Sequence, residues 1–418
     1  MVVAPDGASL ASVTTNGRRR RILVLNQYYW PGVEATAHLL TELCESLAEE
    51  HEVEVVTGVL RGHEDEPREL ERGGVRIVRV SSTAYDRSAL GRRAANYFSY
   101  LGSALTRVLH GERPDLILCM TDPPIVGDLG VLLGRRFRAP VVVISQDVFP
   151  EIATELGRLR NPVVVGVLRL LVGAYLRRAD RIVAIGETMR ARLEAKGTPP
   201  GRLRVIPNWV DTRELTPRPR DNAWAREHDL DARFVVMHSG NVGHAQDLDT
   251  LVRAATFLRD LDDLRVVIVG SGARYAEIAA IAERLEVEET VRFLPYQDRE
   301  KLSYSLSSAD LHVVGLARGL AGYVVPSRLY GVLAVGRPVI ASADDTSETA
   351  RLVREVDCGI VIPPGRAELL ARTIRSAAEG EYELEAMGRR GRAYVEREAD
   401  SPVAMDRYRA LIRELVAG

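Results

Sequence analysis

The chain has 418 residues, which is too long for one compact core and suits two domains. Hydrophobic residues make up 46% of the sequence and charged residues 27%, a balance that excludes a disordered or low-complexity chain. The formal net charge of −2 gives no global reason to expect nucleic acid or an anionic membrane as a partner. Three widely spaced cysteines (Cys44, Cys119 and Cys358) form no metal-ligand cluster and fit a reducing compartment, so we expect a cytoplasmic protein.

The first half of the chain alternates short apolar runs with helical patterns. Residues 1–19 lack the apolar stretch of a signal peptide and are interpreted as a disordered tail. Helices are predicted at 35–49 and 90–109. Strands are predicted at 22–25, 53–56, 75–80, 116–119, 141–144 and 182–185. Alternation of this kind indicates βαβ units and a parallel sheet.

One helix of the first half, at 162–176, is apolar apart from Arg169. It is shorter than the roughly 20 residues that span a bilayer. Two interpretations stay open. The helix packs in the core, or it lies in a membrane interface with Arg177 and Arg178 at headgroup level. The second interpretation corresponds to peripheral contact with the inner face of the membrane.

The pattern restarts after a proline-rich segment at 216–220. Strands are predicted at 234–238, 266–269, 291–294, 311–314, 338–341 and 360–362, and the tail 384–416 is predicted to be helical in two or three pieces. We therefore predict an α/β protein with two Rossmann-like, doubly wound domains. The predicted parts are residues 20–212, 213–392 and a final helix at 393–418. Ligands of such sheets bind beyond the carboxyl ends of the strands, so we expect the loops of both domains to face one cleft.

The segment 322–341 combines a loop, a helix and a strand. Pro326 suits the first position of a helix, and Gly336 suits the positive φ that follows a helix end. Ser327 and Arg328 would then lie at a helix N-terminus, where an anion can approach. The alternative is an ordinary βα unit with a face of small residues.

Two further loops carry glycines between a strand and a helix. One follows the strand at 266–269 and contains Gly270-Ser-Gly272 with Arg274 close behind. The other is His238-Ser-Gly-Asn-Val-Gly-His244. Either loop alone is explained equally well by a turn that needs positive φ. The two loops in one sheet, together with the Ser327–Arg328 helix start, indicate a nucleotide site.

Acidic residues follow one strand of the first half, in Ser145-Gln-Asp-Val-Phe-Pro-Glu151. Asp147 and Glu151 would face the cleft, although helix capping by Asp147 is the alternative. Asp247 and Asp249 resemble a two-carboxylate metal motif, but they lie at a helix start where carboxylates are common. We predict capping for them and no dedicated metal site.

Several segments, in order, resemble the family 4 glycosyltransferases. They are Tyr28-Tyr-Trp-Pro31, 54–58, 177–185, 188–193, 205–211, 239–243, 326–331, 334–341 and 361–365, so the resemblance runs from about Arg20 to about Tyr394. It implies a GT-B fold whose last helix crosses back to the first domain. It also implies retaining transfer from a nucleotide sugar, without a bound metal or another cofactor. Gln146-Asp147 and Ser239-Gly-Asn241 are similar to the branch that builds bacterial surface polysaccharides with amino or deoxy sugars.

The resemblance also implies roles for individual residues. The second domain would bind the donor, expected to be UDP-linked, and the first the acceptor, either a small molecule or a polyprenyl-linked sugar. The donor-binding residues so implied are Gly32, Asn241, Gly243, Arg274, Tyr296, Tyr323, Val324, Val325, Ser327 and Glu348. The acceptor-binding residues are Tyr28, Asn96 and Glu151, and the catalytic residues are Gln146, Asp147 and Arg328.

The sequence departs from the family pattern at the donor site. The two glutamates expected there are replaced by Tyr323 and Gly331, so ribose binding is assigned to Glu348. The usual Arg and Lys pair after the glycine-rich loop is missing, so Arg274 and Arg328 must supply the positive charge. The loss of the glutamates leaves two alternatives open, a non-catalytic partner protein and a sugar-nucleotide epimerase.

Overall fold

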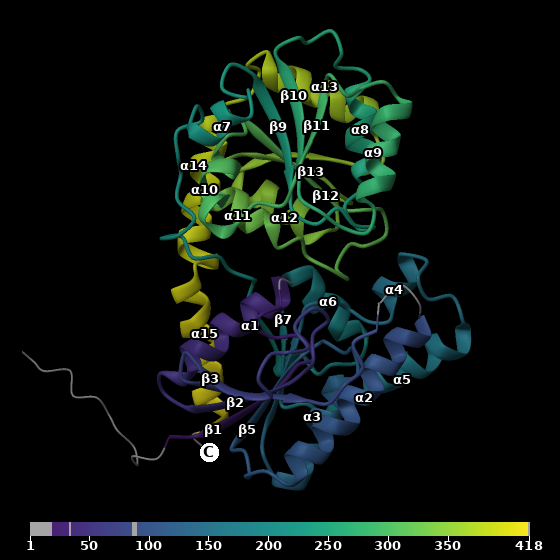
Figure 1. Cartoon of the computed structure of the whole chain (residues 1–418), viewed down its shortest axis with the longest axis vertical. Helices are drawn as coiled ribbons and strands as arrows, with labels where there is room; N and C mark the ends of the chain where they lie inside the picture. Colours follow the sequence, from purple (N-terminus) through teal and green to yellow (C-terminus); the bar gives the residue numbers. More distant parts are fainter. Residues whose placement is uncertain (1–18, 33–34, 86–89, 417–418) are drawn as a thin grey trace, which may run out of the picture.

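The computed structural model describes residues 19–32, 35–85 and 90–416. The chain forms two α/β domains, one above the other along the long axis of the molecule, each built around a sheet (Figure 1). This confirms the predicted α/β class. Of the predicted tail, residues 1–18 lie outside the described ranges.

The N-terminal domain has an eight-stranded sheet in the order β3-β4-β2-β1-β5-β6-β7-β8. Its strands are β1 (Arg21–Leu25), β2 (Glu52–Gly58), β3 (Glu69–Arg72), β4 (Val75–Val80), β5 (Leu116–Met120), β6 (Val141–Ser145), β7 (Arg181–Ala184) and β8 (Leu203–Val205). All neighbours run parallel except β3 and β4, which are antiparallel. The central strands are buried on both faces, which explains their uninterrupted apolar runs.

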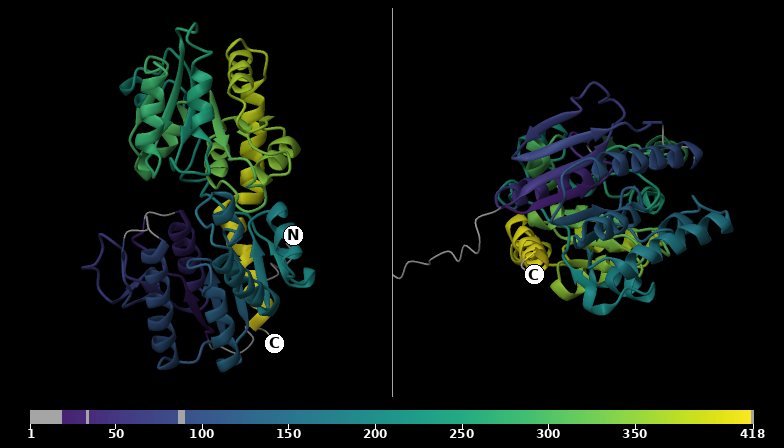
Figure 2. Two further views of the ribbon diagram at one scale, coloured as in Figure 1. Left: turned by 90° about the vertical axis from the view of Figure 1, so that its right-hand side faces the viewer. Right: turned by 90° about the horizontal axis from the view of Figure 1, so that it is seen from below.

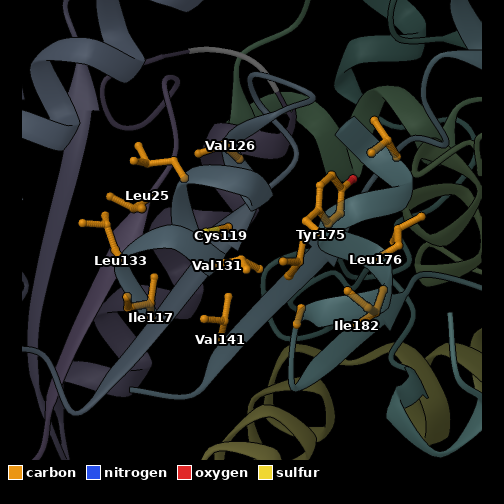
Figure 3. Close-up of a cluster of buried hydrophobic side chains, with 14 of the residues drawn as sticks. Leu25, Ile117, Cys119, Val126, Val131, Leu133, Val141, Tyr175, Leu176 and Ile182 are labelled. Atoms are coloured by element: carbon orange, nitrogen blue, oxygen red, sulfur yellow. The ribbon is translucent and has the colours of Figure 1, made fainter. Parts of the chain in front are cut away.

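Helices cover both faces of this sheet. They are α1 (Ala35–Ala48), α2 (Leu90–Leu109), α3 (Val126–Phe137), α4 (Glu151–Glu155), α5 (Pro162–Arg178) and α6 (Glu187–Ala195). Figure 3 shows the core on one face, where Val131 of α3 and Tyr175 of α5 meet Cys119 and Val141 of the sheet. The approach of α3 is close, since a Cβ at Gly130 would lie 2.5 Å from the Cys119 sulfur. In the described parts of the chain, no helix has the length and apolar character needed to cross a membrane.

The C-terminal domain has a six-stranded parallel sheet in the order β11-β10-β9-β12-β13-β14. The strands are β9 (Phe234–Ser239), β10 (Leu264–Val269), β11 (Val291–Leu294), β12 (Leu311–Gly315), β13 (Val339–Ser342) and β14 (Gly359–Ile362). The helices are α7 (Ala223–Glu227), α8 (Leu248–Ala255), α9 (Tyr275–Arg284), α10 (Arg299–Ser307), α11 (Arg328–Ala334), α12 (Glu348–Val356), α13 (Ala367–Ala378) and α14 (Leu384–Tyr394). The strand order reverses between β9 and β12, so this sheet is doubly wound, as predicted.

Helix α11 begins two residues later than predicted. Pro326 is not its first residue, because a tight turn precedes the helix: the Leu329 amide donates to the Pro326 carbonyl at 3.2 Å, and the Tyr330 amide to Ser327 at 3.2 Å. Arg328, not Pro326, is therefore the first helical residue. Gly336, after the helix end, has the predicted positive φ of 69°.

The last helix returns to the N-terminal domain. After a π-helical turn at Val395–Ala399, α15 (Ser401–Val416) runs down beside α1 (Figure 2). Arg409 of α15 donates to the Ser46 hydroxyl of α1 at 2.8 Å, and the Tyr408 ring packs edge-on against Trp209. The predicted crossing of the C-terminal helix is confirmed, and it holds the two domains together on this side.

Candidate active site

The two domains meet at the loop between β12 and α11, residues 316–327. Its Val324 forms a backbone bridge with Asp147, which follows β6, and the Val148 amide donates to the Tyr323 carbonyl at 2.9 Å. The Arg192 guanidinium lies 4.7 Å from the centre of the Tyr323 ring. Residues predicted separately for catalysis and for donor binding are thus in direct contact across the domain boundary.

Arg328 is half-buried at the start of α11 and has no counter-charge within the described residues. Its Nη1 lies 3.3 Å from His238 Nε2 and its Nη2 lies 3.5 Å from the Gly315 carbonyl, while its Nε is enclosed and has no partner. Within the described residues it forms no ion pair. Burial lowers its pKa to about 10. A cation that is partly withdrawn from water without a counter-charge is costly, so this arrangement favours the binding of an anion.

His238, at the end of β9, belongs to this site although the sequence analysis did not select it. It is fully buried, and burial, followed by the charge of Arg328, holds its pKa well below the usual value. The neutral imidazole can therefore accept a hydrogen bond from Arg328 without neutralising it. In the sequence, His238 begins the predicted glycine loop 238–244, and this position could have indicated that the histidine belongs to the site.

The two glycine loops pack against each other, backbone to backbone. Gly270 has φ 141°, and a Cβ there would lie 2.0 Å from the Gly240 carbonyl oxygen. The Val242 amide donates to the Ser271 carbonyl at 2.8 Å. Gly240, Gly270 and Gly272 have positive φ (130, 141 and 158°), which fits the alternative of a turn that needs positive φ, and the contact between the loops adds a second reason for glycine. Their close packing also fixes the backbone beside Arg328 and His238.

Arg274 does not provide a free charge. Its Nη1 and Nη2 donate to both oxygens of Asp249 at 2.6 and 2.9 Å, and its Nε donates to Glu277 at 2.8 Å. These two carboxylates raise its pKa. The expectation that Arg274 supplies positive charge to a diphosphate therefore has no support in this geometry. Asp249, predicted to cap the helix, is instead the partner of Arg274.

The two catalytic predictions after β6 differ in their surroundings. Gln146 is buried, and its amide is paired reciprocally with that of Asn208 at 3.1 and 2.9 Å, so its polar atoms are occupied. The Asp147 carboxylate accepts no hydrogen bond from the residues that the structure describes. Burial, followed by the charge of Asp122, raises its pKa to about 7. Asp122, which follows the neighbouring strand β5, was missed because a single acid carries no local pattern.

The polar groups predicted to bind an acceptor are mostly engaged within the protein. Glu151 pairs with Lys196 at 2.6 Å and with Arg169 at 3.2 Å. The Asn96 amide binds the backbone of Tyr85 through both of its polar atoms, at 3.0 and 2.9 Å. Tyr28 is buried just after the carboxyl end of β1, and its role toward an acceptor stays a prediction.

Glu348, assigned to ribose from the sequence, instead contacts the N-terminal domain. One carboxylate oxygen accepts the Thr188 amide at the start of α6 at 2.8 Å, and the other is paired with Arg351. Ribose binding by Glu348 would have to displace one of these partners. The remaining predicted donor residues are spread over exposed positions (Asn241, Tyr296), half-buried ones (Gly32, Tyr323, Val324, Ser327) and buried ones (Gly243, Val325).

Comparison with known proteins identifies two matching family models. "Glycosyl transferase 4-like domain" matches residues 33–209, and "Glycosyl transferases group 1" matches residues 221–394. Neither match extends into α15.

Two similar sequences span most of the chain. The "Probable glycosyltransferase WbjE" of Pseudomonas aeruginosa is 26% identical, over 78% of this chain and 82% of that protein. The "Putative colanic acid biosynthesis glycosyl transferase WcaI" of Escherichia coli (strain K12) is 25% identical, over 85% and 92% respectively.

A similar solved structure is that of Anabaena Alr3699/HepE in complex with UDP and glucose. It superposes with a TM-score of 0.74 over 95% of this chain and 100% of that one, at 15% sequence identity. At this identity the likeness shows a shared fold.

Proposed function

Since the chain belongs to the family 4 glycosyltransferases with the GT-B fold, we propose that it moves a sugar from a UDP-linked donor to a hydroxyl acceptor with retention of configuration. The observation that carries the proposal is the half-buried guanidinium of Arg328, which no carboxylate compensates within the described residues. A diphosphate beside it would supply the missing counter-charge. HepE, which shares the fold, has been crystallised with UDP and glucose.

In the proposed mechanism, Arg328 at the start of α11 stabilises the diphosphate as it leaves. A preorganised cation in a buried site does this strongly, because no solvent has to reorganise as the charge develops. The leaving phosphate oxygen takes the acceptor proton, and attack occurs on the face from which the diphosphate departs. Asp147 lies on the acceptor side, where a carboxylate with a pKa of about 7 can hold the acceptor hydroxyl by a hydrogen bond.

We further assign the donor sugar to the N-acetylamino or deoxy sugars and the product to polysaccharide or natural-product biosynthesis. Support comes from the likeness to WcaI, which is named for colanic acid biosynthesis. The acceptor is either a polyprenyl-linked sugar or a soluble molecule. In the described parts of the chain, no three His, Cys, Asp or Glu side chains gather as metal ligands. Metal-independent transfer, which the resemblance implies, is part of the proposal.

Calorimetry with UDP-, GDP- and dTDP-sugars tests the donor, and a coupled assay then tests transfer. We expect a UDP-sugar to bind and free UDP to appear only when an acceptor is added. A sugar converted without nucleotide release would instead indicate an epimerase. No binding by any nucleotide sugar would overturn the proposal and favour a non-catalytic partner protein. The anomeric configuration of the product, read by NMR, decides whether transfer retains configuration.

A further inference from the structure

The first half of α5 exposes an apolar surface. Val163, Val164, Val167 and Leu170 are 72, 43, 51 and 67% exposed. Positions 163, 167 and 170 recur at the spacing that brings side chains to one side of a helix. The second half of α5 is different, because Val172, Tyr175 and Leu176 are buried in the domain core. The helix is therefore anchored at its C-terminal end and presents its N-terminal half to the surroundings.

Arginines dominate the charge around this surface, although Glu151 lies beside Arg169. Between Glu155 and Asp180 the sequence contains no acidic residue and five arginines, at 158, 160, 169, 177 and 178. Arg160, Arg177 and Arg178 are exposed. Arg169 is paired with Glu151 at 3.2 Å, so it adds little charge of its own. The complement of such a surface is an apolar layer edged by negative charge, which is the chemistry of an anionic bilayer.

The position of α5 relates this surface to the cleft. The preceding helix α4 packs against the 316–327 loop of the other domain, where Ile152 lies in one cluster with Leu316 and Leu320. Glu151 of α4 is joined to Arg169 of α5 and to Lys196 just after α6. In Figure 1, α4 lies near the level where the two domains meet, and α5 lies below it in the N-terminal domain. A bilayer held by α5 would therefore lie close to the acceptor side of the cleft.

We propose that residues 160–170, at the N-terminal end of α5, bind the surface of an anionic lipid bilayer. Val163, Val167 and Leu170 insert between the headgroups, and the arginines contact lipid phosphates. The helix lies in the interface, since its 17 residues are fewer than the roughly 20 needed to span a bilayer. The proposal concerns a surface outside the donor site and does not depend on which nucleotide sugar binds there.

Co-sedimentation of the full chain with vesicles tests this surface. We expect binding to vesicles of phosphatidylethanolamine with about a third phosphatidylglycerol, and at least roughly tenfold weaker binding to pure phosphatidylcholine, because attraction to anionic lipid is lost. Val163→Asp/Val167→Asp should weaken binding to the anionic vesicles by at least about tenfold, since apolar insertion is replaced by two repelled charges. Higher salt should weaken binding by the wild-type chain.

A matched control is Phe257→Asp, which changes a side chain of similar exposure, 50%, in the other domain. This variant should bind vesicles as the wild type does. Equal binding by the Val163→Asp/Val167→Asp variant and the wild type would overturn the proposal. The proposal would also be overturned if analytical ultracentrifugation showed a dimer for the wild type and a monomer for the Val163→Asp/Val167→Asp variant. This face of α5 would then be an interface between two copies of the chain. Circular dichroism confirms that each variant is folded, and UDP-sugar binding in solution should be unchanged in both.

Discussion

The guanidinium of Arg328 lies 3.3 Å from the imidazole of His238, Nη1 to Nε2, and within the described residues neither side chain is paired with a carboxylate. The two groups come from different elements, α11 and the end of β9; His238 is buried and Arg328 is half-buried. Burial lowers both pKa values, that of Arg328 to about 10. The histidine orients the guanidinium and leaves its charge available, so a bound anion becomes the first full counter-charge.

Arg328→Ala should abolish most donor binding and transfer. Removing one preorganised group that stabilises a leaving anion costs roughly 10²–10³-fold in kcat, and we expect a loss of this order. Thermal stability should change little, because the substitution removes a half-buried charge that lacks a counter-charge and is held only by long hydrogen bonds. Steady-state kinetics and calorimetry with UDP measure the first effect, and thermal unfolding measures the second.

The matched control for this substitution is Arg389→Ala, since the Arg389 side chain is 71% exposed on α14. It should leave turnover and melting temperature unchanged. Near-normal turnover and UDP affinity in Arg328→Ala would contradict both the role of Arg328 and the assignment of this cleft to the donor.

Arg274→Ala should affect the donor far less than Arg328→Ala. The charge of Arg274 is already neutralised by Asp249 and Glu277, so a donor gains little from it, whereas the loop after β10 loses an anchor. We expect a lower melting temperature and a change in UDP affinity below about threefold, less than 1 kcal/mol. If UDP affinity fell as far as in Arg328→Ala, the expectation from the sequence would stand, and the two carboxylates would have to release Arg274 when the donor binds.

The contrast between these arginines shows what the sequence could and could not predict. Buried strands were predicted closely because an apolar run is the direct consequence of burial on both faces, as in Leu116–Met120, which was predicted at 116–119. Strand β3 was missed because its sequence, Glu-Leu-Glu-Arg, is that of a charged edge strand. Arg328 could be selected from its neighbours in the chain. The neutralisation of Arg274 could not, since Asp249 lies 25 residues away and only the fold brings it near.

Asp147 should give the protein a stability that falls as pH rises toward neutrality. Its pKa in the folded state is raised from 3.8 to about 7, so between these values the folded chain binds more protons than the unfolded one. The free energy of unfolding therefore decreases as pH rises through this window, and the loss is complete above it. Asp147→Asn should be more stable than the wild type at pH 8, by roughly 1 kcal/mol or more, and equal to it below about pH 4. Denaturant unfolding across the pH range measures the difference.

The Asp128→Asn variant separates the pH-dependent change in stability from any change in activity. Burial also raises the pKa of Asp128 to about 7, but this residue, in the first turn of α3, is not one of the residues assigned to the site. The Asp128→Asn variant should be more stable than the wild type, with the same pH dependence as Asp147→Asn, and it should transfer sugar at the normal rate. Asp147→Asn should in addition lose activity or shift its pH profile, and an unchanged profile would remove Asp147 from the acceptor side of the mechanism.

Gly270→Ala should force the two glycine loops apart. The added Cβ would lie 2.0 Å from the Gly240 carbonyl oxygen, and the φ of 141° is strained for any residue with a side chain. We expect a loss of roughly 2 kcal/mol or more in the free energy of unfolding, together with weaker UDP binding. Gly102→Ala on α2 is the control, since its Cβ would meet no atom within 4 Å and alanine favours a helix. A normal melting temperature for Gly270→Ala would mean that the loops are not packed as described.

Glu348→Ala should loosen the contact between the domains and leave donor affinity nearly intact. One oxygen of Glu348 accepts the Thr188 amide at the N-terminus of α6, and the other is held by Arg351. The substitution therefore leaves an unpaired N–H at a helix start and breaks a bond that spans the two domains. The cost should be roughly 1–3 kcal/mol in the free energy of unfolding, as for a buried hydrogen bond to a charged group. Small-angle scattering should report a larger radius of gyration as the domains separate.

The ribose hypothesis for Glu348 predicts the opposite result. If the carboxylate binds the donor ribose, Glu348→Ala would lower UDP affinity by at least about tenfold while the radius of gyration stayed constant. Glu355→Ala is the matched control, because Glu355 lies on the same helix, is exposed and also pairs with Arg351, but makes no contact with Thr188. It should change neither the radius of gyration nor the affinity. One oxygen of Glu348 already has a partner in the N-terminal domain, and the other has a partner in its own domain. We therefore expect the radius of gyration of Glu348→Ala to increase and its UDP affinity to stay constant.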